Sequence, residues 1–160
     1  MGIPAHLWLK DGGGTAIKGS STVSGRDGSI EVISFSHGLR LPIDSQNGKS
    51  TGTRQHAPMM LEKEFDASSP YLYKAVATGQ TLQSAELHWY RIAHSGKEKL
   101  YFVMSLEGVR VSSINPSMTN IKMTDSLSLS PAESVSLMYE RITWRYVDGN
   151  IEYSDSWETR

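Results

Sequence analysis

Residues 99–114, KLYFVMSLEGVRVSSI, form the longest strand-like run in the chain. A strand with one solvated face should alternate strictly between apolar and polar residues. This run instead has apolar side chains at both parities, which are Leu100, Phe102, Met104 and Leu106 on one face and Tyr101 and Val103 on the other. The pattern predicts a sheet that is apolar on both sides and needs a partner surface, and Asn115-Pro116 is expected to end the strand.

Shorter segments with period-2 alternation surround this run, and turn residues separate them. Asp148-Gly149-Asn150 is a strong hairpin turn between the last two segments. Trp144 and Tyr146 are expected to share one strand with Leu137 and Tyr139. The expected strands are residues 5–10, 29–37, 59–65, 84–92, 99–114, 133–147 and 151–157.

One segment, residues 66–79, has helical signals instead. Ser69 is a natural N-cap, Pro70 suits the first helical position, and Gly79 suits the position after the end. The helix should be about two turns long. Its buried stripe is expected to contain Leu72, Val76 and Tyr73.

The fold class that these elements indicate is mainly β. A chain of 160 residues suits one domain, so residues 1–160 are interpreted as a single unit. About eight strands and one helix predict a small two-sheet β-barrel with one short flanking α-helix. A polar, glycine-bearing stretch at residues 44–55 predicts an extended loop.

The composition excludes several classes of function. A formal net charge of −1 implies no bulk attraction to nucleic acid or anionic lipid, and the absence of cysteine excludes disulfides and thiolate chemistry. No apolar run approaches ~20 residues, so no membrane insertion is expected. The amino terminus lacks the pattern of a cleaved signal peptide, which predicts synthesis in the cytoplasm and any secretion without one.

Residues 51–58, TGTRQHAP, place an arginine, a histidine and two threonines in one loop, which suits catalysis. No metal-ligand spacing, nucleophile elbow or phosphate-binding loop accompanies them, because Ile43 stands where the phosphate loop of the nearby GKS needs glycine. We therefore expect no catalytic residue, no cofactor and no metal. A hydrolytic reading would centre on Thr53, Arg54 and His56.

A binding module remains the alternative from the residues alone. Aromatic residues on barrel strands could stack single-stranded nucleic acid or bind another ligand. A nucleic-acid groove also needs aligned cations, and the basic residues here stand singly among acids, so no nucleic-acid partner is expected. The apolar patches favour self-association instead.

Five segments, in order, carry a resemblance to a known family over essentially the whole chain: IPAHLWLKDGGG, GSIEVISFSHGL, GKSTGTRQHAP, SSPYLYKAVATGQTLQSAELHWY and YERITWRYVDGNIEYSDSW. They resemble the haemolysin-coregulated protein (Hcp) family, the inner-tube subunits of the bacterial type VI secretion system. The resemblance implies a non-enzymatic protein that forms homohexameric rings, stacks them into a hollow tube and is itself secreted. It implies a contractile sheath, a spike protein at the tube tip and effector proteins as partners.

The resemblance also implies roles for individual residues. The family has an extended loop that reaches a neighbouring subunit or ring, which makes Thr51, Gly52, Thr53, Arg54 and His56 interface candidates. Alternation places Ser34 and Ser36 on one strand face, where small hydroxyls would suit a lumen wall that contacts effectors. The same periodicity fits an ordinary solvated strand face equally well.

Overall fold

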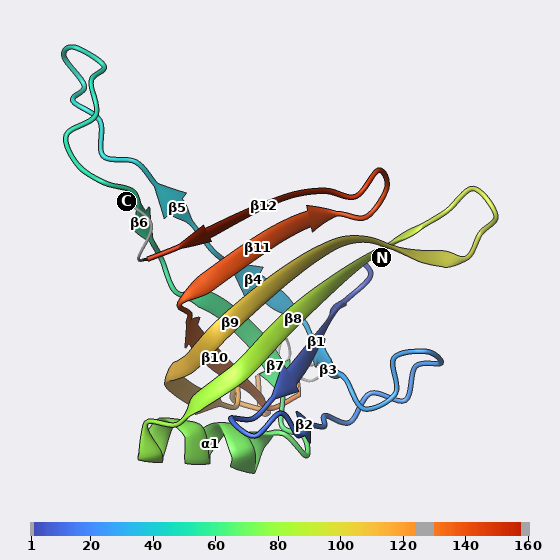
Figure 1. Ribbon diagram of the computed structural model, residues 1–160. Coiled ribbons are helices and arrows are strands. Elements are labelled where there is room, and N and C mark those ends of the chain that lie inside the picture. The colour runs from blue at the N-terminus through green and yellow to red at the C-terminus, as the bar shows by residue number, and fades with distance from the viewer. Residues whose placement is uncertain (1, 124–129, 158–160) are drawn as a thin grey trace.

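The computed structural model describes residues 2–123 and 130–157 of the chain. These residues form one helix and twelve strands, so the mainly β class is confirmed (Figure 1). The elements are β1 (Ala5–Lys10), β2 (Ala16–Ile17), β3 (Ile30–Val32), β4 (Ser34–Ser36), β5 (Leu39–Arg40), β6 (Gln55–His56), β7 (Met59–Glu64), α1 (Ser69–Thr78), β8 (Thr81–Ile92), β9 (Glu98–Ser117), β10 (Ala132–Met138), β11 (Arg141–Tyr146) and β12 (Ile151–Ser156).

Strand β9 organises the sheet. Along one edge it pairs with β8, and its other edge is divided between β11 in its first half and β10 in its second half. The expected end at Asn115-Pro116 is wrong, because β9 continues to Ser117. The ladder with β8 stops at Arg110, so Pro116 lies where β9 has a partner on one side only, and there a missing N–H costs little.

The two far edges of the large sheet meet through residues 30–36. The sheet order is β2-β1-β8-β9-β10-β7-β4, and β3 returns to pair with β1. The expected single strand 29–37 is therefore two short strands, one on each edge, with a break at Ile33. The Ile33 N–H donates to the Glu62 carbonyl at 2.8 Å, so this segment bridges the edges without one continuous ladder.

Helix α1 lies across one end of the barrel (Figure 1). It ends at Gly79, whose φ of 66° is the left-handed conformation that favours glycine. The N-cap is Ser68 and not Ser69. Leu72 is buried as expected, but Tyr73 is exposed and Ala75 takes its place in the buried stripe.

The expected strand 133–147 is also divided. Its residues form β10 and β11, joined at Tyr139-Glu140, because both pair with the same edge of β9. The interpretation that Trp144 shares a strand with Leu137 is therefore wrong. The hairpin turn before β12 is confirmed, with positive φ at Gly149 and Asn150.

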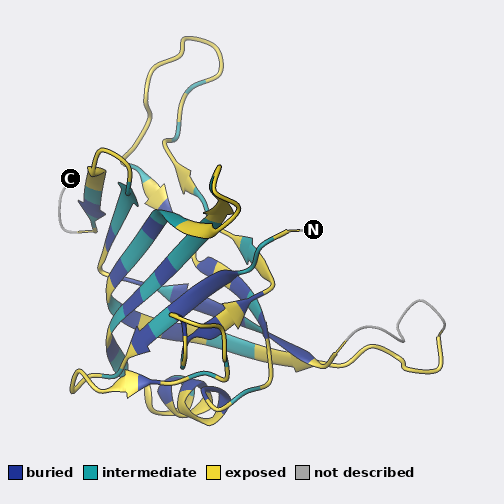
Figure 2. Ribbon diagram, turned by 90° about the vertical axis from the view of Figure 1, so that its right-hand side faces the viewer, coloured by how far each residue is buried: buried dark blue, intermediate teal, exposed yellow. Residues whose placement is uncertain are grey.

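Buried residues gather on the strands of the barrel and on α1 (Figure 2), and their apolar members form one core cluster. Leu106, Val109 and Val111 of β9 contribute to it. Val103 is also buried, at 1% exposure, although its position has the opposite parity to that of Leu106. Its partners on the neighbouring strands are His88 and Arg145. Apolar side chains are thus buried at both parities of β9.

Candidate functional site

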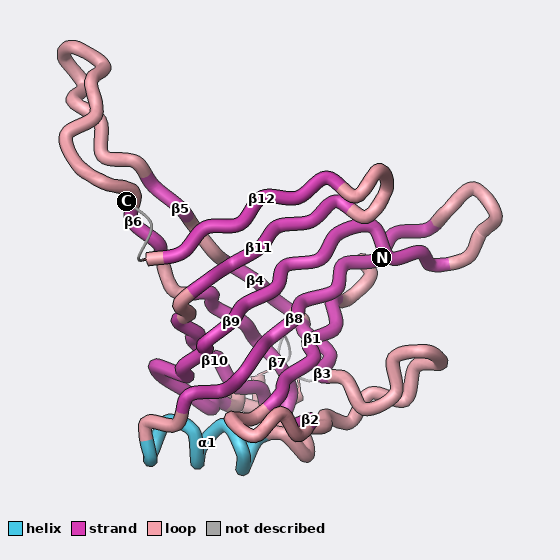
Figure 3. The backbone as a smooth tube through the Cα atoms, in the orientation of Figure 1, coloured by secondary structure: helices cyan, strands magenta, loops and turns pink. Residues whose placement is uncertain are grey.

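A long hairpin projects from the end of the barrel opposite α1, and we call residues 39–56 the arm (Figures 1 and 3). Strands β5 and β6 form its root as a separate two-stranded sheet. Further out, Ile43 bridges to Ser50, and the Asp44 N–H donates to the Lys49 carbonyl at 2.8 Å. The sequence predicted an extended loop here, and hydrogen bonds across the hairpin give that loop a defined course.

Most residues in the outer part of the arm are exposed on both sides of the hairpin (Figure 2). Thr51, Gly52 and Thr53 are all exposed, as an interface role for them requires. The arm also carries apolar side chains that the sequence analysis did not single out, with exposures of 46% at Leu39, 50% at Leu41 and 56% at Ile43. Apolar groups in water along a projection mark a surface suited to contact with another protein.

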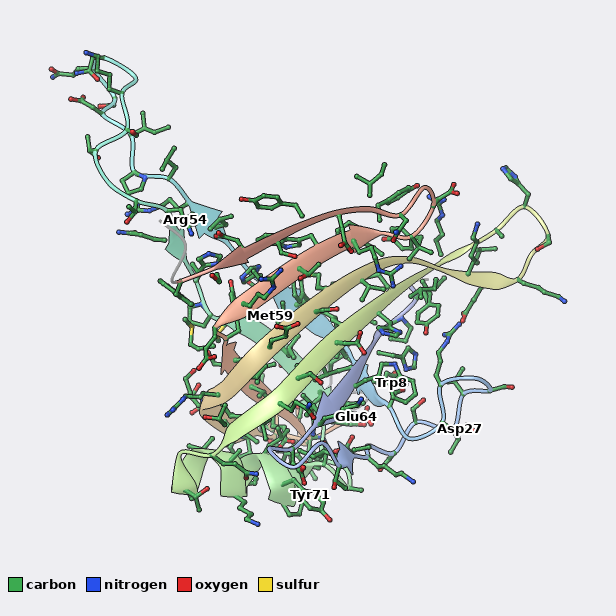
Figure 4. All side chains as sticks on the ribbon, in the orientation of Figure 1. Trp8, Asp27, Arg54, Met59, Glu64 and Tyr71 are labelled. Carbon is green, nitrogen blue, oxygen red and sulfur yellow. The ribbon has the colours of Figure 1, made fainter. Side chains whose placement is uncertain are left out.

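Arg54, labelled at the root of the arm in Figure 4, and His56 instead bond to a residue of the barrel, Asp155 of β12. Arg54 Nε donates to Asp155 Oδ2 at 2.6 Å, and its Nη2 donates to the Ser156 carbonyl at 2.9 Å. His56 Nε2 donates to the same Asp155 oxygen at 2.7 Å. The end of β12 therefore holds the root of the arm.

The hydrogen bonds continue from His56 into the barrel. Its Nδ1 lies 2.6 Å from the Tyr139 hydroxyl, and that hydroxyl lies 2.9 Å from His37 Nε2. The rings of His56 and Tyr139 meet edge to face, with centroids 5.4 Å apart. We call the group Arg54, Asp155, His56, Tyr139 and His37 the latch, because it joins the arm to β12 and to the link between β10 and β11.

The electrostatics of the latch suit attachment more than catalysis. The Arg54 guanidinium holds the pKa of Asp155 below its usual range, and His56 contributes in the same direction. Burial, with the nearby Asp155 charge, raises the pKa of the Tyr139 phenol. An activated phenol would need the opposite shift. The side chains of His56 and Asp155 are only 1% and 4% exposed, so little of the acid or the imidazole reaches solvent.

Ser34 and Ser36 lie on a different surface. Both are exposed on β4, where Ser34 stands opposite Glu62 and Ser36 opposite Met60. The same pairing continues from β7 through β10 to β9, so each serine starts a row of residues across the sheet. The row of Ser34 continues to Ser134 and Asn115, and the row of Ser36 continues to Ser136 and Ser113. The two serines thus belong to a sheet face made mostly of short polar side chains, which is exposed at Ser34, Ser36 and Asn115 and buried at Ser136.

Three members of the latch escaped the sequence analysis: Asp155, Tyr139 and His37. They are far from His56 in the chain, and no local spacing joins them. One signal was available at Asp155. It pairs with Ile142 and follows Ile151 and Tyr153 at the same parity, so a carboxylate stands among apolar residues. Such a position calls for a cationic partner.

Residues 2–123 and 130–157 contain no group of three or more histidine, aspartate or glutamate side chains arranged to hold a metal ion. Within the same part of the chain, no helix is both long enough and apolar enough to cross a membrane.

Comparisons with known proteins agree on one family. The family model described as "Type VI secretion system effector, Hcp" matches residues 6–146. The "Major exported protein" of Pseudomonas aeruginosa is 30% identical over 141 residues, which cover 88% of this chain and 82% of that protein.

Solved structures extend the comparison. A variant of the Hcp1 protein from the E. coli EAEC 042 pathovar is 53% identical, with a TM-score of 0.87 over 97% of this chain and 99% of that one. Hcp1 from Flavobacterium johnsoniae, at 13% identity and a TM-score of 0.60, covers 96% of this chain and 100% of that one and shares the fold alone.

Proposed function

The chain belongs to the Hcp family of type VI secretion system effectors, and from that premise we propose that it is the structural subunit of the secretion tube. It forms homohexameric rings that stack into a hollow tube, acts without catalysis, and is itself secreted with that tube. The tube meets a spike protein at its tip and a contractile sheath around it, and it carries effector proteins in its lumen.

A pair of exposed apolar surfaces on different parts of the chain carries this proposal. One is the arm, with Leu39, Leu41 and Ile43, and the other is β12, with Ile151 at 68% exposure and Tyr153 at 65%. Among the described strands β12 pairs with β11 alone, so one edge of it is open. A ring needs two different, complementary surfaces on each subunit, and these two surfaces can supply them.

Within this proposal the five loop residues divide into two groups. Thr51, Gly52 and Thr53 contact a neighbouring subunit or ring directly, since they lie exposed along the arm. Arg54 and His56 support the interface indirectly from the root of the arm, because their hydrogen bonds to Asp155 fix the direction of the arm. A preoriented arm loses less conformational freedom when it binds.

The polar face that contains Ser34 and Ser36 is proposed as the wall of the lumen. The serines and the asparagine in its rows offer hydrogen bonds without large projections, and only Glu62 and Met60 in these rows are longer. Such a surface lets a protein cargo be retained and still slide, because it provides few of the large aromatic or arginine anchors that dominate tight interfaces.

The proposal is tested by size-exclusion chromatography with light scattering and by negative-stain images of the purified chain. We expect ring-shaped particles of several subunits, and a strictly monomeric species at high concentration would contradict the proposal. The double substitution Leu41→Ser with Ile43→Ser should weaken ring formation or stacking. The matched control is Ile92→Ser, since Ile92 is also exposed, at 64%, but lies away from the arm and from β12.

A further inference from the structure

The turn at the far end of the arm contains an asparagine that glycine follows, Asn47-Gly48, and both residues are exposed. The chain has four asparagines, and the residues after the other three are Pro116, Ile121 and Ile151. The backbone nitrogen of the next residue lies close enough to an asparagine side chain to attack its carbonyl carbon. Proline has no N–H at that nitrogen, and a β-branched side chain crowds it, whereas glycine leaves it open. Asn47 is therefore the asparagine whose neighbour hinders this attack least.

Hydrogen bonds orient the side-chain amide of Asn47 for such an attack. The Lys49 N–H donates to Asn47 Oδ1 at 2.9 Å, and Asn47 Nδ2 donates to Asp44 Oδ2 at 3.3 Å. The bond from Lys49 polarises the carbonyl and would stabilise the negative charge that develops on its oxygen, as an oxyanion donor does. It also closes an Asx turn, which folds the side chain back over the following backbone and brings Cγ towards the Gly48 nitrogen.

The attacking nitrogen is held only by a bond that can open. The Gly48 N–H donates to the Asp44 carbonyl at 2.8 Å, and this bond must break before the nitrogen can turn towards Asn47. Breaking it costs little, because the turn is exposed and a Cβ atom built at Gly48 would meet no atom within 4 Å. The φ of Gly48 is +73°, and glycine rotates freely away from this value.

We infer that Asn47 is a site of spontaneous deamidation, with water as the co-reactant. The Gly48 nitrogen loses its proton to hydroxide and forms a bond to Asn47 Cγ. The bond from Cγ to Nδ2 breaks, and Nδ2 takes a proton from water and leaves as ammonia. Water then opens the cyclic imide at either carbonyl, which gives aspartate or an isoaspartate whose backbone runs through the side chain. The net reaction consumes water, releases ammonia and leaves a carboxylate in place of the amide.

Either product disturbs the end of the arm. The new carboxylate stands beside Asp44 where an amide N–H had donated, so an attraction becomes a repulsion between like charges. Isoaspartate also lengthens the backbone by a methylene between the two sides of the hairpin. The bond from the Asp44 N–H to the Lys49 carbonyl then loses its register, and so does the bridge between Ile43 and Ser50. The reaction belongs to the free chain, whereas its effect on assembly rests on the proposed function of the arm.

Peptide mass spectrometry of the full chain, incubated in mildly alkaline buffer, measures the reaction. Asn120 is an internal control, since it is also exposed and accepts at Oδ1 from the Lys122 N–H at 3.0 Å, but Ile121 follows it. We expect deamidation at Asn47 to be at least about tenfold faster than at Asn120, which corresponds to a barrier lower by about 1.4 kcal/mol. Equal rates at the two asparagines would overturn the inference.

Two variants test the cause of the difference. Asn47→Ser keeps a side-chain acceptor for the Lys49 N–H but has no amide to lose, so the gain in mass should disappear from this peptide. Ile121→Gly should accelerate deamidation at Asn120 towards the rate at Asn47. An unchanged rate at Asn120 in that variant would contradict the role given to the following residue.

Assembly of the same samples distinguishes this inference from the proposed function. Chains are incubated below the concentration at which rings form, until most of Asn47 is converted, and are then concentrated and examined by size-exclusion chromatography with light scattering. We expect the concentration needed for assembly to rise in the native chain and not in Asn47→Ser. If Asn47 converts and assembly does not change, the modification stands and the contact assigned to the arm is wrong. If rings form and Asn47 does not convert, the tube proposal stands and the inference about Asn47 fails.

Discussion

Lys63 of β7 and Glu133 of β10 stand directly opposite each other in the sheet, and their side chains form an ion pair inside the barrel. Both side chains are almost fully buried, with exposures of 1% and 0%. Lys63 also contacts Asp66 at 3.1 Å, and Ser69 donates to Glu133 at 2.7 Å. The pair therefore joins the sheet to the start of α1.

Breaking this pair should destabilise the chain strongly. Lys63→Met leaves the Glu133 carboxylate buried beside Ser69 without its main cation, which should lower the free energy of unfolding by about 3–5 kcal/mol. Urea denaturation followed by tryptophan fluorescence measures this change.

The double variant Lys63→Met with Glu133→Leu is the informative comparison. It removes both charges together and should recover most of the lost stability, since well-packed apolar side chains often replace a buried ion pair at little cost. If the free energy of unfolding of each single variant lies within about 0.5 kcal/mol of that of the native chain, the ion pair does not contribute to stability.

The position of Lys63 also shows what sequence can and cannot predict about the fold. Met59, Leu61 and Lys63 share one parity of β7, so alternation alone places the lysine on the buried face. The identity of its partner could not be predicted, because Glu133 lies 70 residues away. Strand boundaries failed for the same reason at Ile33 and at Tyr139-Glu140, where pairing with distant strands divides a continuous period-2 pattern.

Gly108 marks the point on β9 between its partners β11 and β10, and its φ is +61°. A Cβ atom added there would lie 2.6 Å from Glu140 Oε2 and 2.9 Å from Glu140 Cγ. Gly108→Ala should therefore lower the free energy of unfolding by about 1–3 kcal/mol, part from the backbone conformation and part from the displaced glutamate.

Two further variants divide these contributions. Gly96→Ala has the same kind of backbone strain, with φ of +83° and no atom within 4 Å of the new Cβ, so it should cost only the backbone part. Adding Glu140→Ala to Gly108→Ala should relieve the steric part. If Gly96→Ala and Gly108→Ala lower the free energy of unfolding equally, the steric role given to Glu140 is wrong.

Stability should fall in mild acid. Burial is the largest cause that lowers the pKa of His6, His37 and His88 below 6.5, so each is more easily protonated in the unfolded chain. Below pH 6.5 the unfolded state therefore binds more protons, and each histidine can remove up to about 1.4 kcal/mol per pH unit until its folded pKa is reached. Urea midpoints between pH about 7.5 and 5.5 measure the slope.

A matched pair of variants identifies the source of that slope. His88→Gln should reduce it, since His88 is partly buried on β8 between His6 and Val103. His94→Gln, at an exposed turn position, should leave it unchanged. If the stability of the native chain does not change with pH across this range, the buried imidazoles bind protons equally well in the folded and the unfolded state.

For the candidate site, the sequence predicted the arm but not how it is attached. The polar, glycine-bearing stretch predicted an extended loop at residues 44–55, and the resemblance to a family indicated the overlapping segment 48–58. Burial of His56 could not be read from its neighbours, because the groups that enclose it, Tyr139, Asp155 and Trp157, come from another part of the chain. Hydrogen-bond partners separated by about a hundred residues are set by how the distant strands pair.

The polar face with Ser34 and Ser36 gives a test of the lumen that leaves the fold intact. Both serines are exposed, so Ser34→Trp with Ser36→Trp should change the free energy of unfolding by less than about 0.5 kcal/mol and leave ring formation unchanged. Two indole rings on the wall would narrow the proposed lumen, and co-purification and export of an effector cargo should be lost. Ser95→Trp, in the exposed turn between β8 and β9, controls for the added bulk and should retain both. Cargo that is still carried by the Ser34 and Ser36 variant would mean that this face lies outside the lumen.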